Sequence, residues 1–386
     1  MRAVISVRND GKVNLTTVYS VIIALLPVIM IYNVPIVNKG LSTILVGLTA
    51  PIALYYTFTS FKMCPPVWFV CIFFFYCMYR SWGDFESVFL LFMVLIHVLG
   101  AFGGSLDFRV MRKTIETVAV FCTYLVIIQY VVYFVFGIRF SFLITNLIIN
   151  DNQNAVNSFI DGVGMFRPSA LFLEPSHLAQ YCNLAILSVL FPEGDKKPNL
   201  RKAIWIAAGI ILTTSGMGIV LCGCLLLWYA VFSRRKQGIQ SILRVLFWAV
   251  IIIVAYVLLM RLSFFNSAVG RIFGDHGAIW GRTLFWDSYI GSLKGFDLIF
   301  GKGVNNLPDG YMTGLMEVVY CFGIVGAVLL AIAFMSIATF SKNNVTICAC
   351  IIFLGLQCIA NLFGFIPLIF WFCFTVSSFF KRVNND

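Results

Sequence analysis

Charged residues are scarce in this chain of 386 residues, of which 11% are Asp, Glu, Lys or Arg and 61% are hydrophobic. Ordinary soluble domains contain about 25% charged and 45–50% apolar residues. The composition therefore excludes a water-soluble enzyme and a disordered scaffold. The net charge of +11 does not indicate a nucleic-acid binder, because the Lys and Arg residues stand in short groups between long apolar runs. We predict a polytopic membrane protein.

Motifs typical of metal sites, hydrolases and phosphate-binding loops are also missing from the sequence. The three histidines (His97, His177 and His276) are far apart and the 12 cysteines follow no ligand spacing, so we expect no metal site and no cofactor. The cysteines lie almost entirely in apolar runs, which indicates packing residues. The nucleophile elbow of a Ser-His-Asp hydrolase is absent. The segment 301–303, Gly-Lys-Gly, lacks the spacing of a phosphate-binding loop.

Apolar runs long enough for membrane helices recur along the whole chain. They occupy 17–37, 42–61, 66–79, 87–103, 115–137, 170–191, 203–214, 216–232, 244–262, 314–340, 345–361 and 365–380. The pattern predicts an all-α polytopic fold with about 12 transmembrane helices in a single domain over 1–386.

The stretch 203–232 is one unbroken apolar run with basic clusters on both sides. If both clusters are cytoplasmic, as basic flanks favour, the stretch must enter the membrane and return. We therefore predict two short helices that turn at 214–218. With this hairpin most basic residues and both termini fall on the cytoplasmic side, and the long loops 138–169 and 263–313 fall outside. No signal-peptide cleavage site follows the first run.

An Arg, a Glu and a His lie close together where the first long loop meets a predicted helix. They are Arg167, Glu174 and His177, with Pro175 at a position where the helix either begins or is kinked. Ionisable residues at such a border favour a functional role. The alternative is structural: Glu174 caps the helix and Arg167 extends to lipid headgroups. His177 fits either interpretation equally.

The second long loop carries Arg271, His276 and Arg282 among glycines. Helical spacing of apolar residues over 279–293 predicts a short amphipathic helix at the membrane interface. Arginines on such a helix can bind phosphate oxygens in a bidentate manner, whereas Lys294 is explained by headgroup attraction alone. His276 is a second candidate base. Outer arginines beside a carboxylate suit a lipid-linked phosphate or diphosphate, with diphosphate as the leaving group and Glu or His as the base.

Five short stretches carry a resemblance to a known family. The segment 167–181, the turn at 214–216, and the segments 281–286, 299–303 and 309–310 look like those of the Wzy-type O-antigen/capsular polysaccharide polymerases. The resemblance implies a GT-C-like fold with two long periplasmic loops, diphosphate binding by Arg167, Arg271 or Arg282, and acid–base work by Glu174 or His177. Candidate substrate contacts in or beside these stretches are Lys302, Asn305, Asp309 and Tyr181.

By this resemblance, the chain would join oligosaccharide repeat units carried on undecaprenyl diphosphate at the periplasmic face of a bacterial inner membrane. Membrane lipid surrounds it, and a chain-length regulator and a flippase are the partners that the family implies. Two alternatives remain open. An O-antigen ligase, with His276 as its histidine, shares the layout and the donor. A lipid-linked oligosaccharide flippase or transporter shares the helix number, but the two halves of this chain differ visibly.

Overall fold

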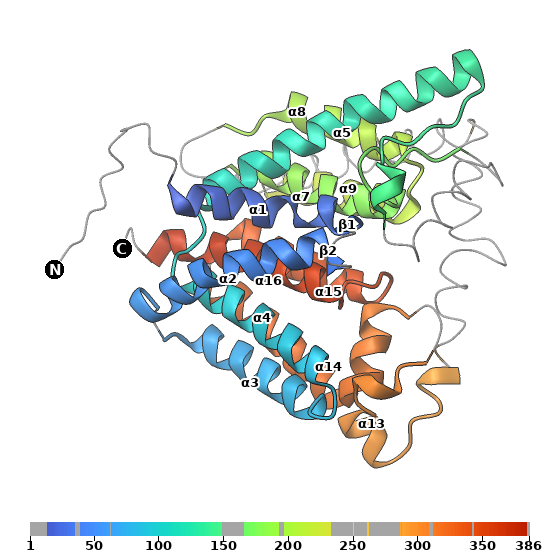
Figure 1. Ribbon diagram of the computed structural model, residues 1–386. Coiled ribbons are helices and arrows are strands. Elements are labelled where there is room, and N and C mark those ends of the chain that lie inside the picture. Colours follow the sequence, from blue (N-terminus) through green and yellow to red (C-terminus); the bar gives the residue numbers. More distant parts are fainter. Residues whose placement is uncertain are drawn as a thin grey trace.

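The computed structural model describes residues 14–34, 39–61, 63–148, 166–192, 197–232, 250, 261, 286, 288–308, 312–341 and 343–383. In these parts the fold is almost entirely helical. Most helices run roughly along one direction and form a bundle (Figure 1). The first helix begins and the last helix ends on one side, which we call the termini end. The two short strands lie at the opposite side, which we call the strand end.

Six described helices belong to the first half of the chain. They are α1 (Leu15–Ile29), α2 (Leu41–Thr59), α3 (Pro65–Arg80), α4 (Phe85–Phe102), α5 (Phe108–Phe136) and α7 (Pro175–Leu190). Side chains of Asn14, Asp84 and Asp107 accept hydrogen bonds from the first backbone N–H groups of α1, α4 and α5. Strands β1 (Asn33–Val34) and β2 (Lys39–Gly40) pair antiparallel.

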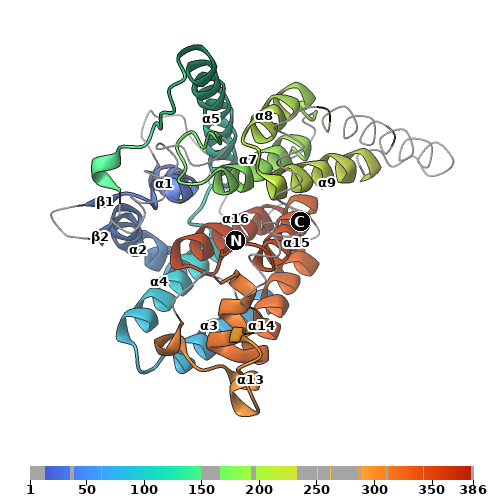
Figure 2. The same ribbon diagram turned by 90° about the vertical axis from the view of Figure 1, so that its right-hand side faces the viewer.

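The second half contains α8 (Leu200–Leu212), α9 (Gly216–Phe232), α13 (Phe296–Phe300), α14 (Gly314–Ser341), α15 (Asn344–Gln357) and α16 (Phe365–Val383). Two 3₁₀ turns cover Thr145–Leu147 and Val304–Asn306. Helix α16 lies inside the bundle and packs against α1, α4, α14 and α15 (Figure 2). Its buried Phe372 packs 4.4 Å from Phe334 of α14, measured between ring centroids.

Each predicted run contains a described helix, apart from the run 244–262, which lies almost wholly outside the described residues. Among the described helices, four are long and apolar enough to cross a membrane: Leu41–Thr59, Phe85–Phe102, Phe108–Phe136 and Gly314–Ser341. An all-α membrane protein is therefore supported at this coarse level. All 12 cysteines lie in described parts and all are free thiols, most of them buried.

Several predicted helix boundaries are wrong. Helix α5 begins at Phe108 and not at 115, because the side chain of Asp107 caps it there, and α15 ends at Gln357 and not at 361. The run 17–37 is helical only over Leu15–Ile29, and the chain then turns into β1. The run 170–191 becomes helical only at Pro175, because proline is favoured at the first helical position and Glu174 before it is extended. Residues 170–174 therefore precede the helix.

The predicted helical hairpin is confirmed as two helices, α8 and α9, with a turn at 213–215. Thr214 adopts a left-handed φ of 52° there and is buried. Helix α7 packs against both arms of the hairpin. The amide of its buried Asn183 donates to the carbonyl of Gly218 at 3.0 Å, close to the turn. The apolar run 203–232 is thus divided into two helices by a turn, as predicted.

Helix α14 is broken at Gly323, although its sequence predicts one continuous run. Gly323 has a φ of 68° and a ψ of −173°. The carbonyl of Phe322, just before the break, accepts a hydrogen bond from the hydroxyl of Tyr76 at 2.8 Å. The backbone carbonyls of Tyr320 and Cys321 accept from the backbone N–H groups of 302 and 303. These three carbonyls beside the break therefore have donors inside the protein, as a membrane interior requires.

Candidate functional site

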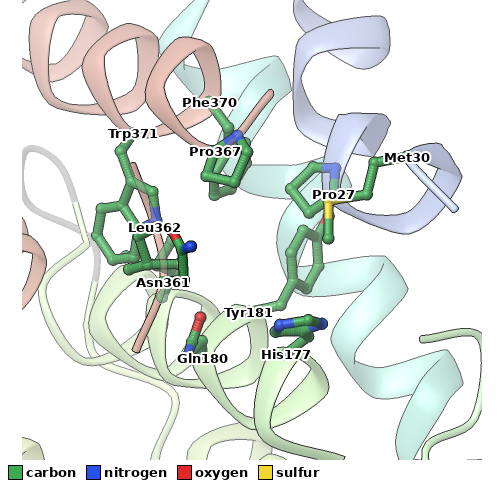
Figure 3. A pocket seen from close by; sticks show the side chains of 11 residues that line it. Pro27, Met30, His177, Gln180, Tyr181, Asn361, Leu362, Pro367, Phe370 and Trp371 are labelled. Carbon is green, nitrogen blue, oxygen red and sulfur yellow. The ribbon is translucent and has the colours of Figure 1, made fainter. Parts of the chain in front are cut away.

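A cavity of about 120 Å³ opens at the strand end between α1, α7 and α16. Helix α7 contributes polar and aromatic side chains, while α1 and α16 contribute mainly apolar ones (Figure 3). The loop between α15 and α16 closes one side. The lining residues are Pro27, Met30, His177, Gln180, Tyr181, Leu184, Asn361, Leu362, Pro367, Phe370 and Trp371.

Glu174 occupies the N-cap position of α7, directly before Pro175. Its side chain does not cap a backbone N–H group; Oε2 instead accepts a hydrogen bond from the hydroxyl of Ser176 at 2.8 Å. The side chain is exposed. Glu174 thus occupies the capping position that the structural alternative predicted, but its side chain does not cap the helix. The carboxylate is accessible and lies three residues before His177.

His177 and Tyr181 lie one turn apart on α7 and both line the cavity (Figure 3). The Tyr181 hydroxyl donates to the carbonyl of Ala24 at 2.8 Å, and its ring stacks on Phe370 with centroids 5.9 Å apart. Tyr181 is only 2% exposed. Its hydroxyl therefore links α7 to α1, and it contributes to the cavity as part of the wall.

Arg167 precedes α7 in a segment that is held against α5. Phe166 stacks on Tyr133 with ring centroids 4.6 Å apart, and the backbone N–H of Ala170 donates to Oε1 of Gln129 at 3.0 Å. Arg167 is partly buried and is not among the cavity-lining residues. The segment thus places Arg167 near the start of α7 but outside the cavity wall.

Lys302 and Asn305 belong to a different part of the strand end, beside α3, α13 and α14. The Lys302 ammonium lies 5.3 Å from the ring centroid of Tyr320, a cation–π contact. Asn305 is exposed. Neither lines the cavity, so the structure does not bring these two predicted contacts together with His177 and Tyr181.

The Gly-Lys-Gly segment has a structural role. Gly301 has a φ of 79°, and a Cβ atom there would collide with the backbone of Cys321 at the break in α14. Its carbonyl accepts a hydrogen bond from the guanidinium of Arg80, at the end of α3. The segment therefore docks on the broken helix, and its glycines permit the close approach.

Three polar residues near the cavity were not predicted. Gln180 and Asn361 line it, and the amide Nδ2 of Asn361 donates to Oε2 of Glu317 at 2.9 Å. Glu317 lies in the first turn of α14. A carboxylate at the start of a long apolar run is a signal that the sequence does carry, because ionisable residues at such positions favour a functional role. The two amides carried no comparable signal.

Four predicted site residues, Arg271, His276, Arg282 and Asp309, lie outside the described residues. So do residues 279–285 and 287 of the predicted interfacial helix over 279–293. Among the residues that the structure describes, no group of three or more His, Cys, Asp or Glu side chains is placed to hold a metal ion.

Comparison with known proteins adds no relative: no family model matches the chain, and no curated protein matches it.

Proposed function

We propose that the chain is a polysaccharide polymerase that joins oligosaccharide repeat units carried on undecaprenyl diphosphate. The observation that carries the proposal is the cavity at the strand end, lined by His177 of α7 with the accessible carboxylate of Glu174 three residues earlier. Cavities with a few convergent polar groups are the usual places for binding and catalysis. The resemblance of 167–181 to the polymerase family supports the same assignment.

The reaction is a glycosyl transfer. A hydroxyl of one repeat unit attacks the anomeric carbon of the growing chain, and the bond from that carbon to the diphosphate oxygen breaks. The diphosphate leaves with the bonding electron pair, and the hydroxyl proton passes to Glu174 or His177. Arginine side chains at the strand end, among them Arg167, stabilise the charge that develops on the diphosphate.

The orientation belongs to the same proposal. The strand end would face the periplasm of a bacterial inner membrane, and the termini end would face the cytoplasm. The start of α1 and the end of α16 lie on one side of the bundle (Figure 1), which suits an even number of crossings and two cytoplasmic termini. The partners are the lipid-linked glycan, membrane lipid, and the chain-length regulator and flippase that the resemblance implies.

The test is the surface polysaccharide of cells whose own copy is replaced by Glu174→Gln, with the protein level measured in membranes. We expect the ladder of repeat units to collapse to a single unit on the lipid core at a normal protein level. Loss of all units from the core, with full-length polymer left on the carrier lipid, indicates a ligase instead. An unchanged ladder removes Glu174 from the site.

A further inference from the structure

Helices α5 and α8 lie side by side at one edge of the bundle (Figure 2). Lys202, near the start of α8, contacts Glu116 of α5. The carbonyl of Leu212, where α8 ends, accepts a hydrogen bond from the hydroxyl of Tyr130, further along α5. Because the contacts follow the same order on both helices, α5 and α8 are parallel. We call the line along which they meet the α5–α8 seam.

The seam begins at the termini end of the bundle. The backbone N–H of Asp107, the N-cap residue of α5, donates to the hydroxyl of Ser20 at 2.8 Å. Ser20 stands in the second turn of α1, and α1 begins at the termini end (Figure 1). The first turns of α5 and α8 therefore meet on the side of the bundle away from the cavity.

Exposed basic side chains flank this end of the seam. Lys113 belongs to α5, Arg201 to the first turn of α8 and Lys197 to the segment just before α8, and all three are exposed. Lys113 precedes Glu116 by three residues, and residues at this spacing share one face of a helix. Lys113 therefore lies on the face of α5 that Lys202 of α8 contacts.

The charge at this end of the seam is positive overall. The sequence segments 107–116 and 193–202 together carry seven Lys or Arg and four Asp or Glu residues. One of the four carboxylates is paired within the seam, because Nζ of Lys202 lies 3.0 Å from Oε2 of Glu116, whose side chain is 18% exposed. The surplus of positive charge favours an anionic partner.

Aromatic and aliphatic surface continues the seam toward the strand end. The rings of Tyr124 and Trp205 have centroids 5.0 Å apart across the seam. Tyr124 is 53% exposed, and Phe121 of α5 and Ile204 of α8 are exposed as well. Trp205 stands one turn after Arg201, so the aromatic pair follows the cations directly. Cations beside a phosphate, and aromatic and apolar surface beside acyl chains, are the contacts that suit a phospholipid.

We infer that the start of the α5–α8 seam binds an anionic phospholipid, with Lys113, Lys197 and Arg201 at the headgroup phosphate and Tyr124 and Trp205 along the acyl chains. A zwitterionic headgroup carries its own ammonium group beside the phosphate, so the positive charge of the protein attracts it less. The inference goes beyond the proposed function and does not depend on it, because the cavity opens at the other end of the bundle.

The experiment is native mass spectrometry of the full chain in detergent, titrated with phosphatidylglycerol or with phosphatidylcholine of the same acyl chains. We expect the first phosphatidylglycerol to bind with the lower dissociation constant. From the usual contribution of one basic residue near a lipid surface, Lys113→Gln or Arg201→Gln should raise that constant about 5-fold, and the double variant about 25-fold. The dissociation constant of phosphatidylcholine should stay the same in all three variants.

Two controls accompany the measurement. Lys113→Arg keeps the charge and should keep the affinity, which separates a loss of charge from a loss of structure. Lys39→Gln removes an exposed lysine at the strand end and should leave the affinity for phosphatidylglycerol unchanged. Equal affinity for the two lipids, an unchanged affinity in the double variant, or a loss in Lys39→Gln as large as that in Lys113→Gln would each overturn the inference.

Discussion

The amide of Asn361 donates a 2.9 Å hydrogen bond to the carboxylate of Glu317, joining the loop before α16 to the first turn of α14 at the edge of the cavity. No ion pair to Glu317 occurs among the residues that the structure describes. An amide therefore holds this carboxylate at the start of a helix long enough to span a membrane.

Removing the amide should destabilise the protein. Asn361→Leu leaves the Glu317 carboxylate without its hydrogen bond, and we expect a loss of about 0.5–1.5 kcal/mol in the free energy of unfolding. The double variant Glu317→Gln/Asn361→Leu should recover part of this loss, because it removes the charge as well. Chemical unfolding in detergent followed by circular dichroism measures both. Equal stability of Asn361→Leu and the unmodified chain would show that the contact is not formed.

One methyl group added at the break in α14, where the 301–303 segment docks, should destabilise the protein. Gly323→Ala places a Cβ at a left-handed φ and against the carbonyl of Ile299, so a loss of at least about 1–2 kcal/mol is expected. Gly47→Ala is the matched control, because Gly47 lies within α2 and a Cβ there meets nothing within 4 Å. That control should be neutral or stabilising by up to about 1 kcal/mol. Similar melting temperatures for the two variants would contradict the break in α14.

The side chain of Gln129 should hold the two ends of the first long loop in place. Its Nε2 donates to the carbonyl of Phe140 at 3.0 Å and its Oε1 accepts from the N–H of Ala170 at 3.0 Å, so one buried side chain holds both ends of the loop. Gln129→Leu should remove the hydrogen-exchange protection of the Ala170 amide. Thr117→Val, an exposed position on the same helix, should not. Unchanged protection in Gln129→Leu would show that the loop is held by other contacts.

Much of the fold follows from the sequence, because long apolar runs and their basic flanks specify helices and their turns. The hairpin at 213–215 is the clearest case, since basic clusters on both sides of one apolar run require the chain to return. The break at Gly323 could not be predicted, because a glycine in an apolar run carries no sign of a positive φ. That conformation depends on 301–303 docking there and on Tyr76 donating to the freed carbonyl of Phe322.

The candidate site was predictable only in part. Glu174, His177 and Tyr181 stand within one short segment, so local spacing places them together. The contact between Asn361 and Glu317 joins residues 44 positions apart, and it exists only because α14 and α15 pack with the loop between α15 and α16 beside the first turn of α14. Pair contacts of this kind depend on tertiary packing, which hydropathy does not encode.

The most direct test of the proposed polymerase activity is to reconstitute the purified chain with its lipid-linked substrate. Cells that lack the chain should accumulate a single repeat unit on the carrier lipid, and this material is the substrate for the purified chain in proteoliposomes. We predict that glycans of increasing length form and that one undecaprenyl diphosphate is released for each unit joined. Movement of the substrate across the membrane with no new glycosidic bond, or transfer only to added lipid A-core, would contradict the account.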